Sequence, residues 1–417
     1  MEAVEEKVDN TLLGKIREQF EGTIPAHWEL TTLGDAFKWR SGGTPLRTNE
    51  KFYGGDIPWL IIGDLNDGVV NEAATTITEE GLANSATRWV EKGAVLLAMY
   101  GSIGKLGIAG RRLTTNQAIA FAQPEPHDAK YLFYFLMHSR GDLSSLGKGA
   151  TQKNISQAVI KAYPFPLAPL PEQRRIVSAI ETQLGRLDAA VARLHAAKAK
   201  LKRYKQAVLK AGVEGPLLEV DYEWITIEEA SERIVDCLHS TPKFTEHGKY
   251  CIDTTCIEQG VIRFDKARFV TEDSYTDRIR RLKPEAGDIL FAREGTVGTT
   301  VVVPEDVDLC LGQRMMMFRL KKTVLPEFFM YVMQSAIMVD KYRPLIMGTT
   351  APHLNIRDIR KFTLPMYPMP MQRKIVARLD VTFEVLREQE TTLDAQLLQS
   401  TRLRQTVLKR AFEGRLV

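Results

Sequence analysis

The chain has 417 residues, which is too long for one ordinary hydrophobic core, so two or three domains are expected. Hydrophobic residues make up 44% and charged residues 26% of the sequence, as in soluble globular proteins, and the longest apolar runs, such as residues 94–99, are far too short to span a bilayer. A net charge of +4 permits a nucleic-acid partner if the basic residues gather on one face, and the acidic, polar amino-terminal residues predict a cytoplasmic protein without a secretory signal.

The first 22 residues are predicted to form a helical segment that resembles the end of the chain. Ile16 and Phe20 line up with Leu408 and Phe412, and the residues around each pair are similar. We therefore expect the amino-terminal segment to lie beside the end of a carboxy-terminal helix.

Two globular parts follow, each rich in short strand-like runs that glycine interrupts. One helix is expected in each part, at 129–139 and at 326–336. This pattern predicts an α+β fold with a twisted, mostly antiparallel sheet and flanking helices. The expected domains are an amino-terminal helical segment at 1–22, a globular domain at 23–168, a central helix at 169–215, a second globular domain at 216–367 and a carboxy-terminal helix at 368–417.

The two halves of the chain are copies of one unit of roughly 200 residues. Residues 164–177 read PFPLAPLPEQRRIV and residues 363–376 read TLPMYPMPMQRKIV, an offset of 199 residues. Earlier in each half, SGGTP at 41–45 corresponds to LHSTP at 238–242. Small changes of offset between matching elements are what surface loops tolerate, so each copy is a globular part followed by a tail.

Both tails are predicted to be long helices, because proline stands at 171 and 370 and the following stretches contain almost no proline or glycine. About 43 residues at 1.5 Å each would give a rod of about 64 Å. Apolar residues spaced four and three apart form the heptad seam of a coiled coil. The predicted coiled-coil interface consists of Ile180, Leu184, Leu187, Val191, Leu194, Leu201, Val208, Leu379, Phe383, Leu386, Leu393, Leu397 and Val407.

Two copies related by a pseudo-twofold axis would place these helices antiparallel. With their ends matched, the numbers of facing residues should add up to about 587, which puts Tyr204 opposite Phe383 and Lys198 close to Glu390.

The sequence contains no recognisable catalytic motif. GSIGK at 101–105 lacks the spacing of a phosphate-binding loop, and its copy GTVGT at 295–299 has no lysine, so a tight turn between strands is predicted. Neither the seven histidines nor Cys237, Cys251, Cys256 and Cys310 have metal-ligand spacing, and we expect reduced, buried thiols. A binding or assembly role is therefore favoured, with no metal or cofactor on this chain.

Two similar domains on a rigid, pseudo-symmetric rod suit duplex DNA, whose grooves recur every ~34 Å. Basic, amide and hydroxyl side chains can contact phosphates or base edges, and glycines let the backbone approach a phosphate. A solvated surface or a simple turn is an equally good interpretation of any single position. The candidate DNA-binding residues are Ser41, Gly42, Gly43, Thr44, Arg47, Lys51, Tyr53, Tyr100, Ser102, Lys105, Arg111, Lys148, Gln152, Lys153, Ser240, Thr241, Lys243, Arg293, Glu294, Thr296, Gln313, Arg314, Arg343, Thr349 and His353.

SGGTPLRTNEKFYGGDIPWL at 41–60, GATQKNIS at 149–156 and the doubled P-x-P-x-Q-[RK]-[RK]-I-V motif resemble the specificity (S) subunits of Type I restriction-modification systems. The resemblance covers essentially the whole chain. It implies two target recognition domains, each reading one half of a bipartite, gapped DNA site, and helices that act as a ruler for the gap. In the second half GTTAPHLN replaces GATQKNIS, a divergence that reading two different half-sites would require.

The same resemblance implies the partners. Repeated helical surfaces would dock two methyltransferase (modification) subunits, and restriction subunits would join that core. S-adenosylmethionine would be bound by the modification subunits, and ATP and Mg2+ would serve the restriction subunits, so this chain would be non-catalytic. The alternatives are a recognition subunit that serves a methyltransferase of another type, and a coiled-coil scaffold that does not bind DNA.

Overall fold

The computed structural model divides into two compact units, and each long helix contributes residues to both. One unit comprises the chain up to Leu194 together with Gln396–Val417, and the other comprises His195–Ala395. The long helices are α7 (Leu170–Glu214) and α13 (Met369–Phe412). The residues that the structure describes are 10–123, 125–148, 153–215, 220–258, 260–348 and 352–417.

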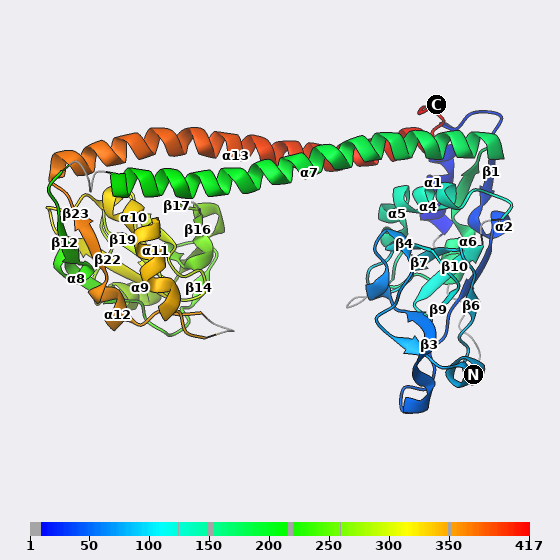
Figure 1. Ribbon diagram of the computed structural model, residues 1–417, viewed down its shortest axis with the longest axis horizontal. Helices are drawn as coiled ribbons and strands as arrows, with labels where there is room; N and C mark the ends of the chain where they lie inside the picture. The colour runs from blue at the N-terminus through cyan, green and yellow to red at the C-terminus, as the bar shows by residue number, and fades with distance from the viewer. Residues whose placement is uncertain (1–9, 124, 149–152, 216–219, 259, 349–351) are drawn as a thin grey trace. The chain divides into compact units, whose positions relative to one another are not determined.

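The described strands of the first unit lie in three sheets (Figure 1). The pairs β4–β8 and β3–β9 are parallel, and the other paired strands are antiparallel. In sheet order the strands are β1 (Glu29–Thr32) and β11 (Pro164–Leu167); β2 (Lys38–Ser41), β10 (Ile119–Gln123), β7 (Val95–Ala98), β8 (Leu106–Ala109) and β4 (Gly68–Val70); and β5 (Thr76–Ile77), β3 (Tyr53–Leu60), β9 (Leu113–Thr115) and β6 (Trp89–Val90). The helices before α7 are α1 (Asn10–Glu21), α2 (Leu33–Ala36), α3 (Glu79–Ala83), α4 (Ala129–His138), α5 (Arg140–Ser145) and α6 (Gln157–Ala162), with 3-10 turns η1 (Glu50–Phe52) and η2 (Ile62–Asp64).

The second unit repeats this arrangement. In sheet order its strands are β12 (Glu223–Thr226) and β23 (Thr363–Met366); β13 (Ser231–Asp236), β22 (Met315–Leu320), β19 (Ile289–Ala292) and β20 (Thr300–Val302); β14 (Phe244–Thr245), β18 (Arg268–Val270), β15 (Lys249–Ile252) and β21 (Leu309–Leu311); and β16 (Ile257–Glu258) and β17 (Val261–Ile262). Its helices are α8 (Ile227–Ala230), α9 (Glu272–Ile279), α10 (Pro326–Gln334), α11 (Ala336–Tyr342) and α12 (Ile356–Lys361), with 3-10 turns η4 (Thr254–Cys256), η5 (Phe264–Lys266) and η6 (Arg343–Leu345).

Matching strand orders confirm the internal repeat. The order β2-β10-β7-β8 of the first unit recurs as β13-β22-β19-β20 in the second, and the parallel pair β3–β9 recurs as β15–β21. The helices expected at 129–139 and 326–336 are α4 and α10. The α+β fold is confirmed, but the expectation of a mostly antiparallel sheet per domain missed the separate sheets and their parallel pairs.

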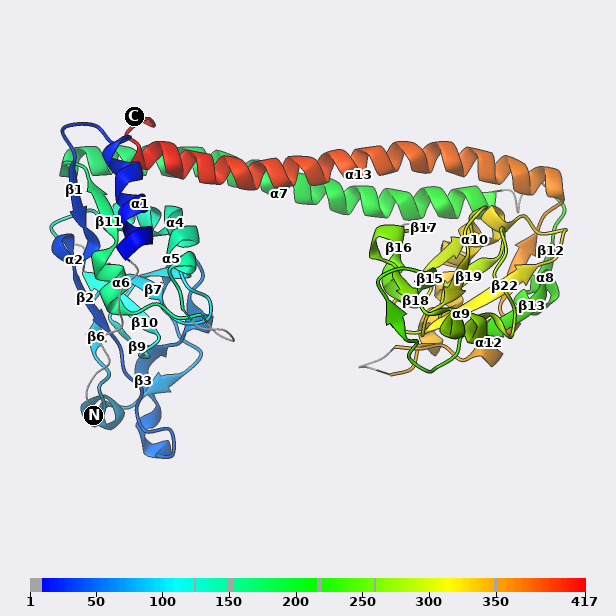
Figure 2. The same ribbon diagram turned by 180° about the vertical axis from the view of Figure 1, so that it is seen from behind.

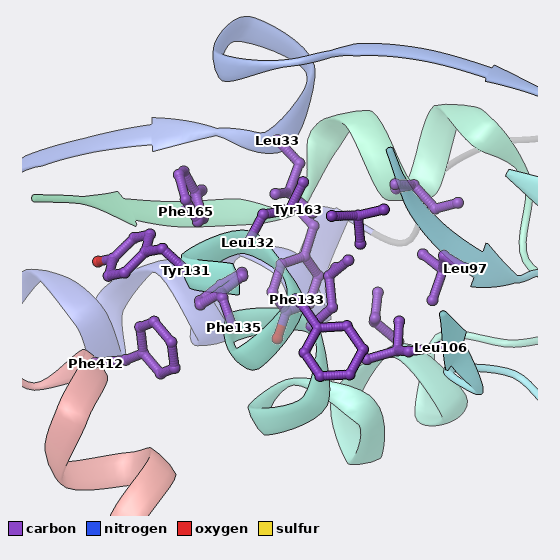
Figure 3. Packing of buried hydrophobic residues seen from close by; sticks show 14 of the residues in the cluster. Leu33, Leu97, Leu106, Tyr131, Leu132, Phe133, Phe135, Tyr163, Phe165 and Phe412 are labelled. Carbon is purple, nitrogen blue, oxygen red and sulfur yellow. The ribbon is translucent and has the colours of Figure 1, made fainter. Parts of the chain in front are cut away.

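Helix α1 and the carboxy-terminal end of α13 meet in the core of the first unit, as the sequence predicted. Ile16 and Phe20 of α1 share one apolar cluster with Leu408 and Phe412 of α13. Figure 3 shows Phe412 beside the aromatic side chains of α4, and its ring centroid lies 5.3 Å from that of Phe135. Edge-to-face contacts of this kind add to the free energy gained by burying the rings.

A buried glutamine fastens the start of α7 to the first globular domain. Gln173 is fully buried; its side-chain oxygen accepts a hydrogen bond from the Asp128 N–H (2.9 Å), and its amide donates to the Ala168 carbonyl (2.8 Å). Asp128 is the N-cap of α4, so one side chain joins the first turn of the long helix to the start of a domain helix.

Gln372 does the same at the start of α13. Its side-chain oxygen accepts from the Leu325 N–H (2.8 Å), its amide donates to the Tyr367 carbonyl (2.8 Å), and it too is fully buried. Leu325 is the N-cap of α10, the counterpart of α4. The glutamine of the repeated motif is therefore a structural anchor in both units.

Within each unit the two long helices run side by side in opposite directions (Figure 2). Lys198 binds Asp394 (2.5 Å) in the second unit, and Asp188 binds Arg404 in the first. The numbers of these facing residues add up to 592 rather than the predicted 587.

The predicted register is therefore wrong by about one helical turn. Tyr204 does not face Phe383: Tyr204 is 55% exposed, and the ring of Phe383 stacks on Tyr331 of α10. Glu390 pairs with Lys205, and Lys198 pairs with Asp394. The hydrogen bond to Asp394 raises the pKa of Lys198, and so does the charge of Glu390, so the predicted closeness of Lys198 and Glu390 is confirmed. The physical reason is that the first turns of each helix pack on their own globular domain, so the helix ends are staggered and not matched.

All four cysteines are free and buried, which confirms the prediction of reduced, buried thiols. Cys251 and Cys310 lie opposite each other on the parallel strands β15 and β21. No helix in the described part of the chain is long and apolar enough to cross a membrane.

Replacing Gln372 with alanine tests the anchor. Gln372→Ala leaves the Leu325 N–H and the Tyr367 carbonyl buried without their partner, so we expect the free energy of unfolding of the second unit to fall by about 2–4 kcal/mol. Urea denaturation measures this change. Arg373→Ala, at the exposed neighbouring position, should alter stability by only about 0.5 kcal/mol. Equal losses in the two variants would contradict the anchoring role.

Candidate nucleic-acid interface

A pair of adjoining loops brings several predicted DNA-binding residues together in the first unit. The turn between β7 and β8 contains Gly101 and Gly104, both with positive φ (65° and 84°), a conformation that glycine adopts without strain. Its edge pairs with the segment around residue 154: Tyr100 forms a bridge with Asn154, and the Gly101 N–H donates to the Lys153 carbonyl (3.0 Å). Tyr100, Ser102, Lys148 and Lys153 therefore belong to one surface.

The second unit builds the same pair of loops from different residues. Glu294 forms a bridge with His353, and the Gly295 N–H donates to the Pro352 carbonyl (2.8 Å). Gly295 and Gly298 again have positive φ. Glu294, Thr296 and His353 thus correspond to the group in the first unit, and the exposed Arg343 in η6 shortly precedes the second loop. We call these two surfaces the hairpin platforms, residues 99–105 with 147–155 and residues 293–299 with 346–354, apart from the undescribed 149–152 and 349–351.

Gly42 and Gly43 allow close packing inside the first domain. Both are buried, and their N–H groups donate to the carbonyls of Ile119 (3.4 Å) and Thr115 (3.0 Å). A Cβ on Gly42 would lie 1.9 Å from the Thr115 carbonyl oxygen. The close approach that these glycines allow is to the protein's own strand end, and their contact with DNA stays a prediction.

A threonine–glutamine contact recurs next to each platform, and the sequence analysis did not pair these residues. The Thr44 hydroxyl donates to the side-chain oxygen of Gln117. In the second unit the Gln313 amide donates to the Thr241 hydroxyl (3.3 Å) and to the His239 carbonyl (2.6 Å). The repeat could have revealed this, because Thr44 with Thr241 and Gln117 with Gln313 stand at nearly the same offset in the two halves.

Arg293 is engaged in internal ion pairs, and its contact with DNA stays a prediction. It is 8% exposed; its Nε lies 3.0 Å from Asp236 Oδ1, and an Nη lies 2.8 Å from Glu294 Oε1. A buried guanidinium needs such partners because desolvation is costly. Next to this cluster, burial raises the pKa of the Cys237 thiol, which keeps the thiol neutral.

Lys105 and Tyr53 also have internal partners. The Lys105 ammonium donates to the carbonyls of Ile62 (3.1 Å) and Gly63 (3.3 Å), and the Tyr53 hydroxyl donates to Pro45 (2.8 Å). Both side chains hold loops of the first domain, which leaves little of their donor capacity for DNA.

The remaining candidates fall into three groups. Arg47, Lys51 and Arg111 are exposed in other loops of the first unit, and no contact among the described residues joins them to its platform. Ser240 and Lys243 are exposed in the loop that Gln313 holds, Ser41 is half-buried at the end of β2, and Arg314 is exposed beside the second platform. Gln152 and Thr349 lie outside the described residues.

Every residue of the predicted helix interface is buried or half-buried. The predicted interface left out further buried positions on these helices, among them Leu209, Val213 and Ser400. Among the described residues no group of His, Cys, Asp or Glu side chains is placed to hold a metal ion.

Gly42→Ala tests whether this glycine is needed for packing inside the domain or for contact with phosphate. The added methyl group would collide with Thr115, so we expect the first unit to lose about 1–3 kcal/mol of stability in thermal or chemical unfolding. Gly141→Ala is the matched control, because nothing lies within 4 Å of its Cβ and it sits in α5, where alanine is favoured. Unchanged stability in Gly42→Ala together with weaker DNA binding would restore the phosphate interpretation.

Comparison with known proteins identifies the repeated unit. A family model described as "Type I restriction modification DNA specificity domain" matches twice, at residues 25–199 and 221–399. The MjaVIII specificity subunit of a type I restriction enzyme from Methanocaldococcus jannaschii is 22% identical over 391 residues, covering 89% of this chain and 90% of that protein. The EcoBI specificity subunit from Escherichia coli is 24% identical over 356 residues, 79% of this chain and 74% of that protein.

Solved structures share the fold. A chain from a structure described as "Structural basis underlying complex assembly and conformational transition of the type I R-M system" superimposes with a TM-score of 0.73 and 17% identity, covering 94% of this chain and 99% of that one. The HsdS subunit from Thermoanaerobacter tengcongensis superimposes with a TM-score of 0.52 and 16% identity, over 94% and 98% of the two chains. With two copies of the family domain spanning most of its length, the chain belongs to the DNA specificity family of type I restriction-modification systems.

Proposed function

We propose that this chain gives a type I restriction-modification complex its DNA sequence specificity, and that each globular domain reads one half of a bipartite, gapped site. The observation that carries the proposal is the pair of hairpin platforms. Their backbone contacts are equivalent, since Tyr100–Asn154 in one unit corresponds to Glu294–His353 in the other. Their side chains differ, as two readers of different half-sites require.

Exposed cations around the platforms would supply the contacts to phosphate. Lys153 on the first platform and Arg343 beside the second are exposed, whereas Arg293 is neutralised inside the domain. Phosphate contacts position a protein on DNA without reading sequence, so base recognition falls to other side chains on the same surfaces.

The long helices would set the gap between the half-sites. Each runs without a break through residues that belong to both units, and a helix of fixed residue count has a fixed length. Their outer faces would dock two methyltransferase subunits, to which restriction subunits would bind. S-adenosylmethionine would be bound by the modification subunits and ATP with Mg2+ by the restriction subunits, so the chain itself would be non-catalytic.

Salt-dependent DNA binding tests the proposal against a scaffold role. The chain with its methyltransferase partner should bind duplex DNA with an affinity that falls linearly with salt concentration on a double logarithmic plot, by about 0.9 per phosphate contacted. Arg343→Gln should lower this slope by about 1. Lys283→Gln should not, because Lys283 is already paired with Asp308 (3.4 Å). A complex that binds no DNA at any salt concentration would favour the scaffold.

Shortening the helices tests the ruler. Deleting seven residues from the middle of both α7 and α13 preserves the heptad phase and shortens each helix by about 10 Å. We expect the complex to methylate sites with a shorter gap and unchanged half-sites, as measured by mapping methylated bases in a host genome. Deletion of seven residues from α13 alone is the control and should disrupt the pairing. An unchanged gap in the double deletion would contradict the ruler.

A further inference from the structure

Arg314 occupies a backbone position that ordinarily belongs to glycine. It lies between β21 and β22 with φ of +69°, in the left-handed region that costs energy for a residue with a side chain. Strained residues of this kind gather at functional sites, where the surrounding structure holds them in place. The side chain of Arg314 is exposed, so no demand of the core explains the choice of arginine.

The residues on both sides of Arg314 hold it rigidly. Gln313 donates hydrogen bonds to the His239 carbonyl and the Thr241 hydroxyl. Gly312 packs so closely on Asp253 that a Cβ would lie 2.7 Å from the Asp253 Cβ. The Arg314 carbonyl itself accepts from the Arg293 N–H (3.1 Å).

The guanidinium of Arg314 lies at the second hairpin platform. A Cβ built on Gly295 would be 3.9 Å from its Nη1, an ordinary van der Waals distance, which places the guanidinium beside the turn of the platform. Among the described residues, the Arg314 side chain has neither a hydrogen bond nor an ion pair. Arg293, by contrast, is neutralised by Asp236 and Glu294. Arg314 therefore presents a full set of free donors on the proposed DNA-facing surface.

At the position equivalent to Arg314, the first unit holds an alanine instead of a cation. In the first unit Ile119 pairs with Ala98, and at the same place in the repeat Met315 pairs with Ala292. The residue just before Ile119 is Ala118, and the residue just before Met315 is Arg314, so these two positions are equivalent. Ala118 is 8% exposed. The glutamine before it, with its contact to a threonine, is shared, whereas Ala118 lacks both the cation and the left-handed backbone of Arg314.

We propose that Arg314 is a base-reading residue of the second domain and that it recognises a guanine through the major-groove edge. This inference rests on the proposed function and deepens it. The two-pronged guanidinium matches the N7 and O6 acceptors of guanine, which is the commonest specific contact between proteins and DNA. A phosphate contact would need only a cation within reach, not a strained and rigidly held backbone.

Mapping the methylated motif tests the assignment, because it reports every position of the site separately. The full complex with wild-type chain is compared with complexes that carry Arg314→Lys or Arg314→Gly. Both variants should lose preference for guanine at one position of one half-site, by about 10- to 100-fold, and keep the other half-site unchanged. Exchanging residues 23–168 for those of another family member should leave that position intact, because the second domain reads it.

Stability measurements distinguish a loss of base recognition from a loss of the folded structure. Glycine relieves the left-handed backbone, so Arg314→Gly should unfold at the same temperature as wild type or at a higher one while its specificity is relaxed. Asp306→Gly is the matched control: Asp306 is exposed in the same domain with φ of +57°, on the far side of β20 from the platform. It should keep both the stability and the motif.

Three outcomes would overturn the assignment. The motif of Arg314→Gly could be unchanged, or both half-sites could relax together. Alternatively, methylation of all sites could weaken uniformly with a shallower salt dependence, which would make Arg314 a phosphate contact. A wild-type complex that methylates no defined motif would overturn the proposed function, and the inference with it.

Discussion

The buried glutamine at the start of each long helix is the interaction on which the rest of the structure depends. Gln173 and Gln372 join a backbone N–H at the start of a domain helix to a carbonyl just before the long helix. Because the glutamine is fully buried, leaving any of these groups unpaired would be costly, so the helix has one permitted direction of departure from its domain. A long helix can set a fixed gap only if it does not rotate about the point where it joins its domain.

The two hairpin platforms show how one scaffold carries two different readers. Backbone hydrogen bonds and positive-φ glycines hold the loops in place, and neither depends on the identity of the exposed side chains. Internal ion pairs such as Arg293 with Asp236 remove charge that would otherwise attract any anion. What is left on the surface is a small set of residues, among them Arg314 in the second unit and Lys153 in the first, that differ between the domains.

Local patterns predicted most of the fold, whereas features set by distant contacts were missed. The heptad spacing and the proline at each helix start are local, and α7 and α13 appear where they were expected. The helix register is not local, since it depends on how far the first turns pack onto the domain, which the heptad repeat does not encode. The internal contacts of Arg293 and Gly42 were missed for the same reason: their partners, Asp236 and Thr115, lie 57 and 73 positions away in the sequence.

The contacts that hold the backbone of the second platform do not involve its exposed side chains, so specificity can change without a change in the fold. Strain at Arg314 is tolerated because Gln313, Gly312 and the Arg293 N–H fix the backbone from three sides, and none of those contacts uses the arginine side chain. The backbone at this position is therefore set independently of the residue that reads DNA. A substitution of Arg314 therefore changes which base is recognised and leaves the fold of the domain, the anchor glutamine and the helix pairing unchanged. Specificity can then diverge in one domain of a duplicated protein while the other domain and the two long helices stay unchanged.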